Sequence, residues 1–154
     1  MTDLSLPARP SRRILLTGAA AAIAAISAGA VFGRRDRFDG AEISPDAALD
    51  AIRTGELTMI DIRRPDEWAA TGIAEGAYPL DMRRDDFVDA LATLVEGERD
   101  RPIALICARG VRSDRMSARL GQAGFERIID VPEGMLGSSA GPGWVARGLP
   151  VVQP

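Results

Sequence analysis

Residues 103–120 read IALICARGVRSDRMSARL. The apolar run 103–106 has the length and composition of a short buried strand, and the residues that follow Ser113 have helical character. A strand, a tight loop and a helix in this order form the repeating unit of α/β folds, in which helices cover a parallel sheet. Ligand sites in such folds lie at the carboxyl ends of the strands, where the next helix begins. The loop 107–113 is therefore expected to contain the functional site.

Cys107 opens this loop and is the candidate catalytic residue. Helix N-termini and successive loop N–H groups attract anions, and a thiol placed beside them tends to react as the thiolate. Arg109 and Arg112 add positive charge to the same loop. The alternative is that Cys107 only fills the core at the end of a strand, since free cysteines are among the most buried residues. Two arginines and a glycine so close to it favour a nucleophilic cysteine in an anion-binding loop.

The composition excludes several kinds of chemistry. All 19 basic residues are arginine, and the sequence contains neither lysine nor histidine. These absences exclude His-containing metal sites, Ser-His-Asp triads, Cys-His dyads and Schiff-base lysines. A single cysteine excludes an intramolecular disulfide and the usual four-ligand zinc site. We therefore expect no metal and no cofactor, and catalysis by Cys107, carboxylates, arginines and backbone dipoles.

The size and charge of the chain limit its class further. A sequence of 154 residues, of which 46% are hydrophobic, supports one domain with a real core. The net charge is −3, without long basic runs in the body of the chain. This balance argues against nucleic-acid binding.

The first 33 residues have the layout of an export segment. A polar, positively charged start ends in Ser11-Arg12-Arg13, and residues 14–33 carry no charge and are rich in alanine. Ala28-Gly29-Ala30 supplies the small residues of a signal-peptidase site, and the arginine pair resembles a twin-arginine signal. An uncleaved membrane anchor is the alternative, since the apolar run is just long enough to span a bilayer. We expect export to the periplasm, or an inner-membrane tether with the domain facing the periplasm.

After a charged linker (34–42), the pattern predicts a single domain over residues 43–152. Caps, breakers and apolar spacing indicate helices alternating with strands. The expected helices are 45–53, 65–71, 85–95 and 113–123, and the expected strands are 57–63, 77–80, 103–107 and 127–131. The fold class is therefore α/β, with a central, mostly parallel sheet and helices on both of its faces.

The loop also carries a family resemblance. Cys107, Gly110, Arg112 and Ser113 fit the pattern C-x-x-G-x-R-S. This pattern resembles the active loop of the rhodanese-like sulfurtransferases, which opens with their catalytic cysteine. The resemblance implies a rhodanese-like three-layer α/β fold.

Three flanking segments resemble the same family, in the family's order. Residues 59–68 are similar to its D-V-R-x-x-x-E-[FWY] segment, residues 125–135 to its closing strand and G-G-M turn, and residues 144–151 to its final W-x-x-x-G-L-P-V. Two segments depart from the family. Residues 72–77 lack its usual histidine, and residues 138–143 form a Gly-rich insertion, interpreted as an inert surface loop or, alternatively, as a lid or partner-facing loop.

The resemblance implies sulfane-sulfur transfer, an enzymatic activity like that of thiosulfate sulfurtransferases. The Cys107 thiolate would take sulfur from a small anionic donor such as thiosulfate and become a persulfide, and a thiol acceptor would remove that sulfur. The residues expected to bind the substrate are Ala108, Arg109, Gly110, Val111, Arg112 and Ser113. Arg109 and Arg112 are expected to attract the donor, Arg112 through its bidentate fork.

One acidic and one basic residue at the end of a neighbouring strand have weaker claims on the site. Asp61 is expected to hold an arginine or the loop, and Arg63 to add positive charge. For both residues, a plain surface ion pair at a strand end is the alternative.

Two other functions compete with sulfur transfer. A cysteine phosphatase or arsenate reductase needs Cys-x5-Arg, whereas Arg112 comes one position too early and Ser113 stands in its place. A rhodanese-fold binding or sulfur-carrier module would not need catalysis, but such a module would be recognised by a lost cysteine, and Cys107 is present. We expect a monomer.

Overall fold

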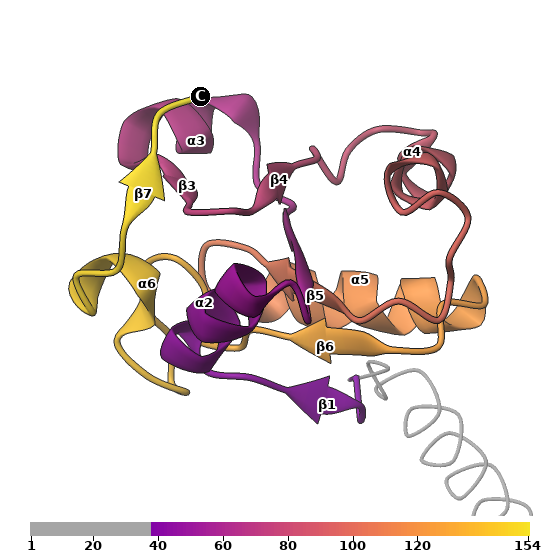
Figure 1. The fold of residues 1–154 in the computed structure, drawn as a ribbon. Helices are drawn as coiled ribbons and strands as arrows, with labels where there is room; N and C mark the ends of the chain where they lie inside the picture. The colour runs from indigo at the N-terminus through magenta and orange to yellow at the C-terminus, as the bar shows by residue number, and fades with distance from the viewer. Residues whose placement is uncertain (1–37) are drawn as a thin grey trace, which may run out of the picture. The chain divides into compact units, whose positions relative to one another are not determined.

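The computed structural model describes residues 38–154. Its main sheet contains five strands in the order β1-β6-β5-β2-β4, and every neighbouring pair is parallel (Figure 1). The strands are β1 (Ala41–Glu42), β2 (Thr58–Asp61), β4 (Tyr78–Pro79), β5 (Ile103–Ile106) and β6 (Ile128–Asp130). Two further short strands, β3 (Ile73–Ala74) and β7 (Val151–Val152), pair antiparallel. The predicted α/β class is confirmed.

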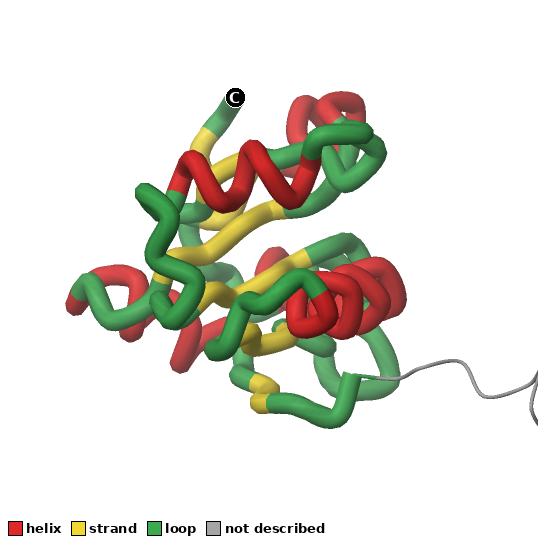
Figure 2. Tube along the Cα trace, turned by 90° about the vertical axis from the view of Figure 1, so that its right-hand side faces the viewer, coloured by secondary structure: helices red, strands yellow, loops and turns green. Residues whose placement is uncertain are grey.

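Helices cover both faces of this sheet. They are α2 (Pro45–Thr54), α3 (Pro65–Thr71), α4 (Phe87–Leu94), α5 (Val111–Gln122) and α6 (Gly143–Ala146). Side chains of α4 and α5 form one core with strands β2, β5 and β6, and side chains of α2 and α6 form a second core on the opposite face. Figure 2 shows the strands in the middle of the domain with helices on both sides. This arrangement is the expected three-layer fold.

Local signals place the helix ends. Helix α2 begins after Ser44, whose Oγ accepts a hydrogen bond from the Ala47 N–H, and it has Pro45 at its first position. The helix ends at Gly55, which has φ 77° and therefore the left-handed conformation that glycine adopts easily. Both ends lie within a residue or two of the prediction.

Several boundaries differ from the prediction, among them those of β1 and of helix α5. Strand β1 lies in the segment interpreted as linker, because its Ala41 and Glu42 pair with Ile129 and Asp130 of β6. The sheet therefore begins before residue 43. Helix α5 begins at Val111 and not at Ser113, since Gly110 is its N-cap and accepts the first helical hydrogen bond from the Asp114 N–H at 3.0 Å.

The predicted export segment, residues 1–33, lies outside the described residues. Within residues 38–154, no helix has both the length and the apolar character needed to cross a bilayer.

The insertion 138–143 is a tight turn in the structure. The Ser138 N–H donates to the Gly141 carbonyl at 2.9 Å, and the Gly141 N–H donates back at 3.3 Å. The Ser138 hydroxyl donates to the Pro132 carbonyl at 2.7 Å, and the Gly143 N–H donates to the Glu133 carboxylate at 3.0 Å. These bonds attach the turn to the segment that follows β6.

Candidate active site

Cys107 lies at the carboxyl end of β5, between strands β2 and β6. Its side chain faces the core that contains α4 and α5 and is only 1% exposed. The Cys107 carbonyl accepts a hydrogen bond from the Met135 N–H at 2.8 Å, and the Ala108 carbonyl accepts one from the Leu136 N–H at 2.9 Å. The loop after Cys107 is thus held against the segment 132–136.

Two glycines make this close contact between backbones possible. Gly110 has φ 80°, and a Cβ added there would lie 2.2 Å from the Pro132 carbonyl oxygen. Gly134 has φ 67°, and its added Cβ would lie 2.6 Å from the Ala108 carbonyl oxygen. Any larger residue at either position would force the loop and the segment 132–136 apart.

The amides of the loop are available to an anion. Among residues 38–154, the N–H groups of residues 108–113 donate no hydrogen bond, and the first helical bond comes from Asp114. These groups lead into the N-terminus of α5, where the helix dipole also favours negative charge. The loop is therefore a site where a thiolate or a small anion can be stabilised.

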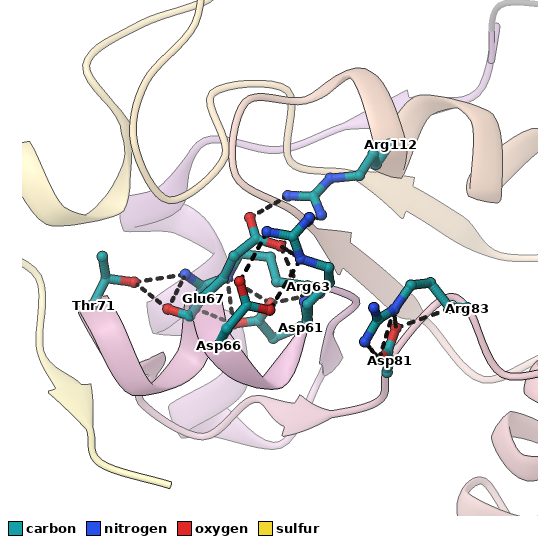
Figure 3. A network of polar contacts seen from close by, with 9 residues as sticks. Asp61, Arg63, Asp66, Glu67, Thr71, Asp81, Arg83 and Arg112 are labelled. Atoms are coloured by element: carbon teal, nitrogen blue, oxygen red, sulfur yellow. Dashed lines mark hydrogen bonds and ion pairs between the residues drawn. The ribbon is translucent and has the colours of Figure 1, made fainter.

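Arg112 extends from α5 to Glu67 in the first turn of α3. Its guanidinium donates to the two oxygens of Glu67 at 2.7 and 2.6 Å (Figure 3). This bond lowers the pKa of Glu67 to about 2 and raises the pKa of Arg112, which the nearby Cys107 thiolate raises further. The fork expected to bind the donor is thus occupied by Glu67, while Arg112 remains close to the reactive sulfur.

Arg109 has a different environment. It is exposed, and its guanidinium donates only to the Gly137 carbonyl, at 3.4 Å. Within the described part of the chain, no carboxylate forms an ion pair with it. Arg109 is therefore the loop arginine that is available to an incoming anion.

Asp61 and Arg63 form a buried pair. The Arg63 guanidinium binds both Asp61 oxygens, the closest contact being 2.6 Å, and the side chains are 1% and 0% exposed. Arg63 also donates to the Gly72 carbonyl at 2.6 Å and to the Thr71 hydroxyl at 2.6 Å. Arg63 therefore fastens the C-terminal end of α3 to the end of β2, and its charge does not reach the solvent. The surface ion pair considered as the alternative is not what the structure shows.

The remaining loop residues have distinct positions. Ser113 is fully buried, and its hydroxyl donates to the Gly110 carbonyl at 2.9 Å. Val111 is 58% exposed, and Ala108 is half-buried. Sequence reasoning did not propose Glu67 for this site, although it is the glutamate of the family-like segment 59–68.

Comparison with known proteins agrees with this geometry. A family model described as "Rhodanese-like domain" matches residues 44–140. Thiosulfate sulfurtransferase GlpE of Actinobacillus succinogenes is 27% identical over 111 residues, which cover 71% of this chain and 88% of that protein. A sulfurtransferase of Allochromatium vinosum is 29% identical over 101 residues, covering 66% of this chain and 83% of that protein.

Solved structures show the same fold. The solution structure of the rhodanese-like domain of Alr3790 from Anabaena has a TM-score of 0.59 at 21% identity, covering 73% of this chain and 79% of that one. The polysulfide-sulfur transferase of Wolinella succinogenes has a TM-score of 0.56 at 22% identity, covering 75% and 80%. Since the family model spans more than half of the sequence, the chain belongs to the rhodanese-like domain family.

Proposed function

We propose that this protein is a sulfurtransferase that moves sulfane sulfur from a small anionic donor such as thiosulfate to a thiol acceptor through a persulfide on Cys107. The observation that carries the proposal is the position of Cys107 at the start of a loop whose amides, residues 108–113, are free of acceptors within the described chain. The relatives named sulfurtransferases support the same reaction class.

The reaction proceeds in two displacements at sulfur. The Cys107 thiolate attacks the outer sulfur of thiosulfate, a new S–S bond forms, and sulfite leaves with the electron pair of the bond that breaks. The acceptor thiolate, or cyanide in a test tube, then attacks the outer sulfur of the persulfide. This second step gives an acceptor persulfide or thiocyanate and returns the Cys107 thiolate. The free amides stabilise the negative charge on sulfur in both states.

Intact-mass measurement tests this proposal directly. After incubation with thiosulfate, the purified protein is expected to gain the mass of one sulfur atom, and cyanide should remove it. The Cys107→Ser variant should gain no mass, and because Cys107 is the only cysteine, no other thiol complicates the result. If the folded protein gained no sulfur from thiosulfate or from other sulfane donors, the transferase assignment would be wrong, and a rhodanese-fold binding module would replace it.

Arg109 is assigned to recognition of the donor. Replacing it with methionine is expected to raise the KM for thiosulfate about twofold to fivefold with little change in kcat, as for the loss of one solvent-exposed charge. The matched control is Arg119→Met, an exposed arginine two turns along α5 from the loop, which should leave both constants unchanged. A fall in kcat at unchanged KM would contradict the assignment.

We also propose that the domain acts after export. The support is the sequence of residues 1–33, with its arginine pair, apolar run and Ala28-Gly29-Ala30 site. Replacing Arg12 and Arg13 with lysine should retain the protein inside the cell if the twin-arginine route is used. Unchanged export of this variant would point to the general secretory route.

A further inference from the structure

A buried carboxyl lies under the candidate active loop. Asp130 is the last residue of β6, opposite Leu105 of β5, and it is 3% exposed. Because side chains alternate along a strand, Asp130 faces the same side as Ile128, the side covered by α5. Within residues 38–154, its Oδ1 is buried and has no hydrogen-bond partner. A buried polar atom without a partner is costly and calls for an explanation.

Ser113 connects this carboxyl to the loop. It lies fully buried in the first turn of α5 and is within hydrogen-bonding reach of Asp130. In the structure, its hydroxyl donates to the Gly110 carbonyl at 2.9 Å. Gly110 is the left-handed residue of the loop, and the peptide that follows it supplies the free Val111 N–H. Ser113 therefore stands between Asp130 and the backbone of the anion site.

The hydroxyl of Ser113 has a single proton to donate. When Asp130 is protonated, it can donate to the Ser113 oxygen while Ser113 keeps its bond to Gly110. When Asp130 is ionised, it can only accept, and it competes with the Gly110 carbonyl for the Ser113 proton. The protonation of Asp130 thus determines whether Ser113 holds Gly110.

The surroundings of Asp130 place this change in an accessible pH range. Burial raises its pKa to about 6, the nearby Ser113 hydroxyl acts in the opposite direction, and the charges of Asp114 and Glu42 raise it further. The polar side chains that act on it are Ser113 and Asp114 of α5 and Glu42 of β1. Because the folded-state pKa is raised, ionised Asp130 disfavours the fold, a cost absent below about pH 4 and complete above about pH 6.

We propose that Asp130 is a positioning residue that acts through Ser113 on the Gly110 carbonyl, so that its protonation sets the geometry of the loop and the reactivity of Cys107. The link to sulfur transfer rests on the proposed function, but the effect on the thiol does not. Reactivity is expected to be higher with Asp130 protonated, when the Ser113–Gly110 bond is kept.

The proposal is tested by measuring the rate at which iodoacetamide alkylates Cys107 between pH 4.5 and 8.5. Mass spectrometry reports the alkylated fraction at each time point. Once the rise due to thiol ionisation is fitted, the rate of the wild-type protein should show a second step near pH 6, falling about threefold to tenfold, the equivalent of one ordinary hydrogen bond. Asp130→Asn keeps the shape and a donor but cannot ionise, so it should lose this step and follow the protonated limb. Ser113→Ala keeps the carboxyl but cuts the connection, and should lose the step as well.

Two control variants distinguish the titration of Asp130 from that of the neighbouring carboxyls. Glu42→Gln and Asp114→Asn should retain the step and move it to lower pH, because each removes a charge that raises the pKa of Asp130. A step that persists in Asp130→Asn, or in folded Ser113→Ala, would overturn the proposal. Sulfur loading from thiosulfate, measured on the same samples, separates the two claims. If the protein takes up sulfur but the alkylation rate shows no step near pH 6, only the role of Asp130 is wrong. If the rate shows the step but the protein takes up no sulfur, only the transferase assignment is wrong.

Discussion

Replacing Arg63 with methionine is expected to lower the free energy of unfolding by about 3–5 kcal/mol, the range for breaking a buried ion pair by removing one partner. The substitution leaves the charge of Asp61 buried without compensation. It also removes the donors that bind the Gly72 carbonyl and the Thr71 hydroxyl at the end of α3. Urea unfolding at 25 °C, followed by tryptophan fluorescence and circular dichroism, measures the loss.

The chain contains a matched control for this experiment. Arg83 binds Asp81 with the same two-residue spacing and also through its guanidinium (Figure 3). In both pairs the backbone N–H of the arginine donates to the aspartate as well. The Arg83 side chain, however, is 62% exposed. Arg83→Met should therefore change the free energy of unfolding far less than Arg63→Met does. Similar losses in both variants would show that burial does not distinguish the two pairs.

A second variant addresses the buried charge itself. Asp61→Asn combined with Arg63→Met removes both charges, so the double variant should be more stable than Arg63→Met alone. If the double variant were less stable, the loss in Arg63→Met would come from the contacts to Thr71 and Gly72, and not from the isolated carboxylate.

Arg112→Met is expected to lower kcat/KM for sulfur transfer about tenfold to hundredfold, the equivalent of one or two charge-assisted hydrogen bonds. Arg112 is held by Glu67 in two bonds and lies close enough to Cys107 to respond to the thiolate. Its loss frees the start of α5 from α3 and removes positive charge from the reactive sulfur. Steady-state kinetics with thiosulfate and cyanide measure the change.

Exchanging the two charges separates these roles. In the double variant Glu67→Arg with Arg112→Glu, the ion pair can form again, so stability should recover relative to either single variant. Activity should not recover, because the new carboxylate stands beside Cys107 and disfavours the thiolate. Recovery of both quantities would mean that Arg112 acts only by connecting α5 to α3.

The pH dependence of the Glu67–Arg112 pair follows from the direction in which the pKa of Glu67 is shifted. The folded-state pKa of Glu67 is lowered to about 2 from 4.5, so the pair stabilises the fold fully above about pH 4.5 and loses that contribution as the pH falls through about 2. The pair is therefore intact throughout the range in which Asp130 titrates, and the two effects can be measured independently.

The sequence predicts the elements that local signals define. Ser44 with Pro45, and Gly55, mark the ends of α2, and the apolar run before Cys107 marks β5. What local signals do not define is pairing across the fold. Strand β1 contains only Ala41 and Glu42 and has no pattern of its own, so only its hydrogen bonds to β6 reveal it.

The same distinction applies to the site. The loop 107–113 is recognisable because strand, glycine and arginines are adjacent in the chain. The partner of Arg112 is not recognisable, because Glu67 comes from another helix, 45 residues away in sequence. Asp61 and Arg63 read as surface residues from their charge, and only the helix that packs over them makes them interior. Asp130 is concealed in the same way by α5.

The burial of Cys107 affects whether two copies of the protein can form a disulfide under oxidising conditions. A disulfide between two copies needs sulfur atoms about 2.05 Å apart and Cα atoms within about 7 Å. Cys107 is only 1% exposed, so the sulfur atoms of two folded copies have little access to one another. Burial therefore disfavours a disulfide between folded copies through Cys107. The fold itself thus protects a solitary cysteine from dimerisation, without a second cysteine or a reducing partner.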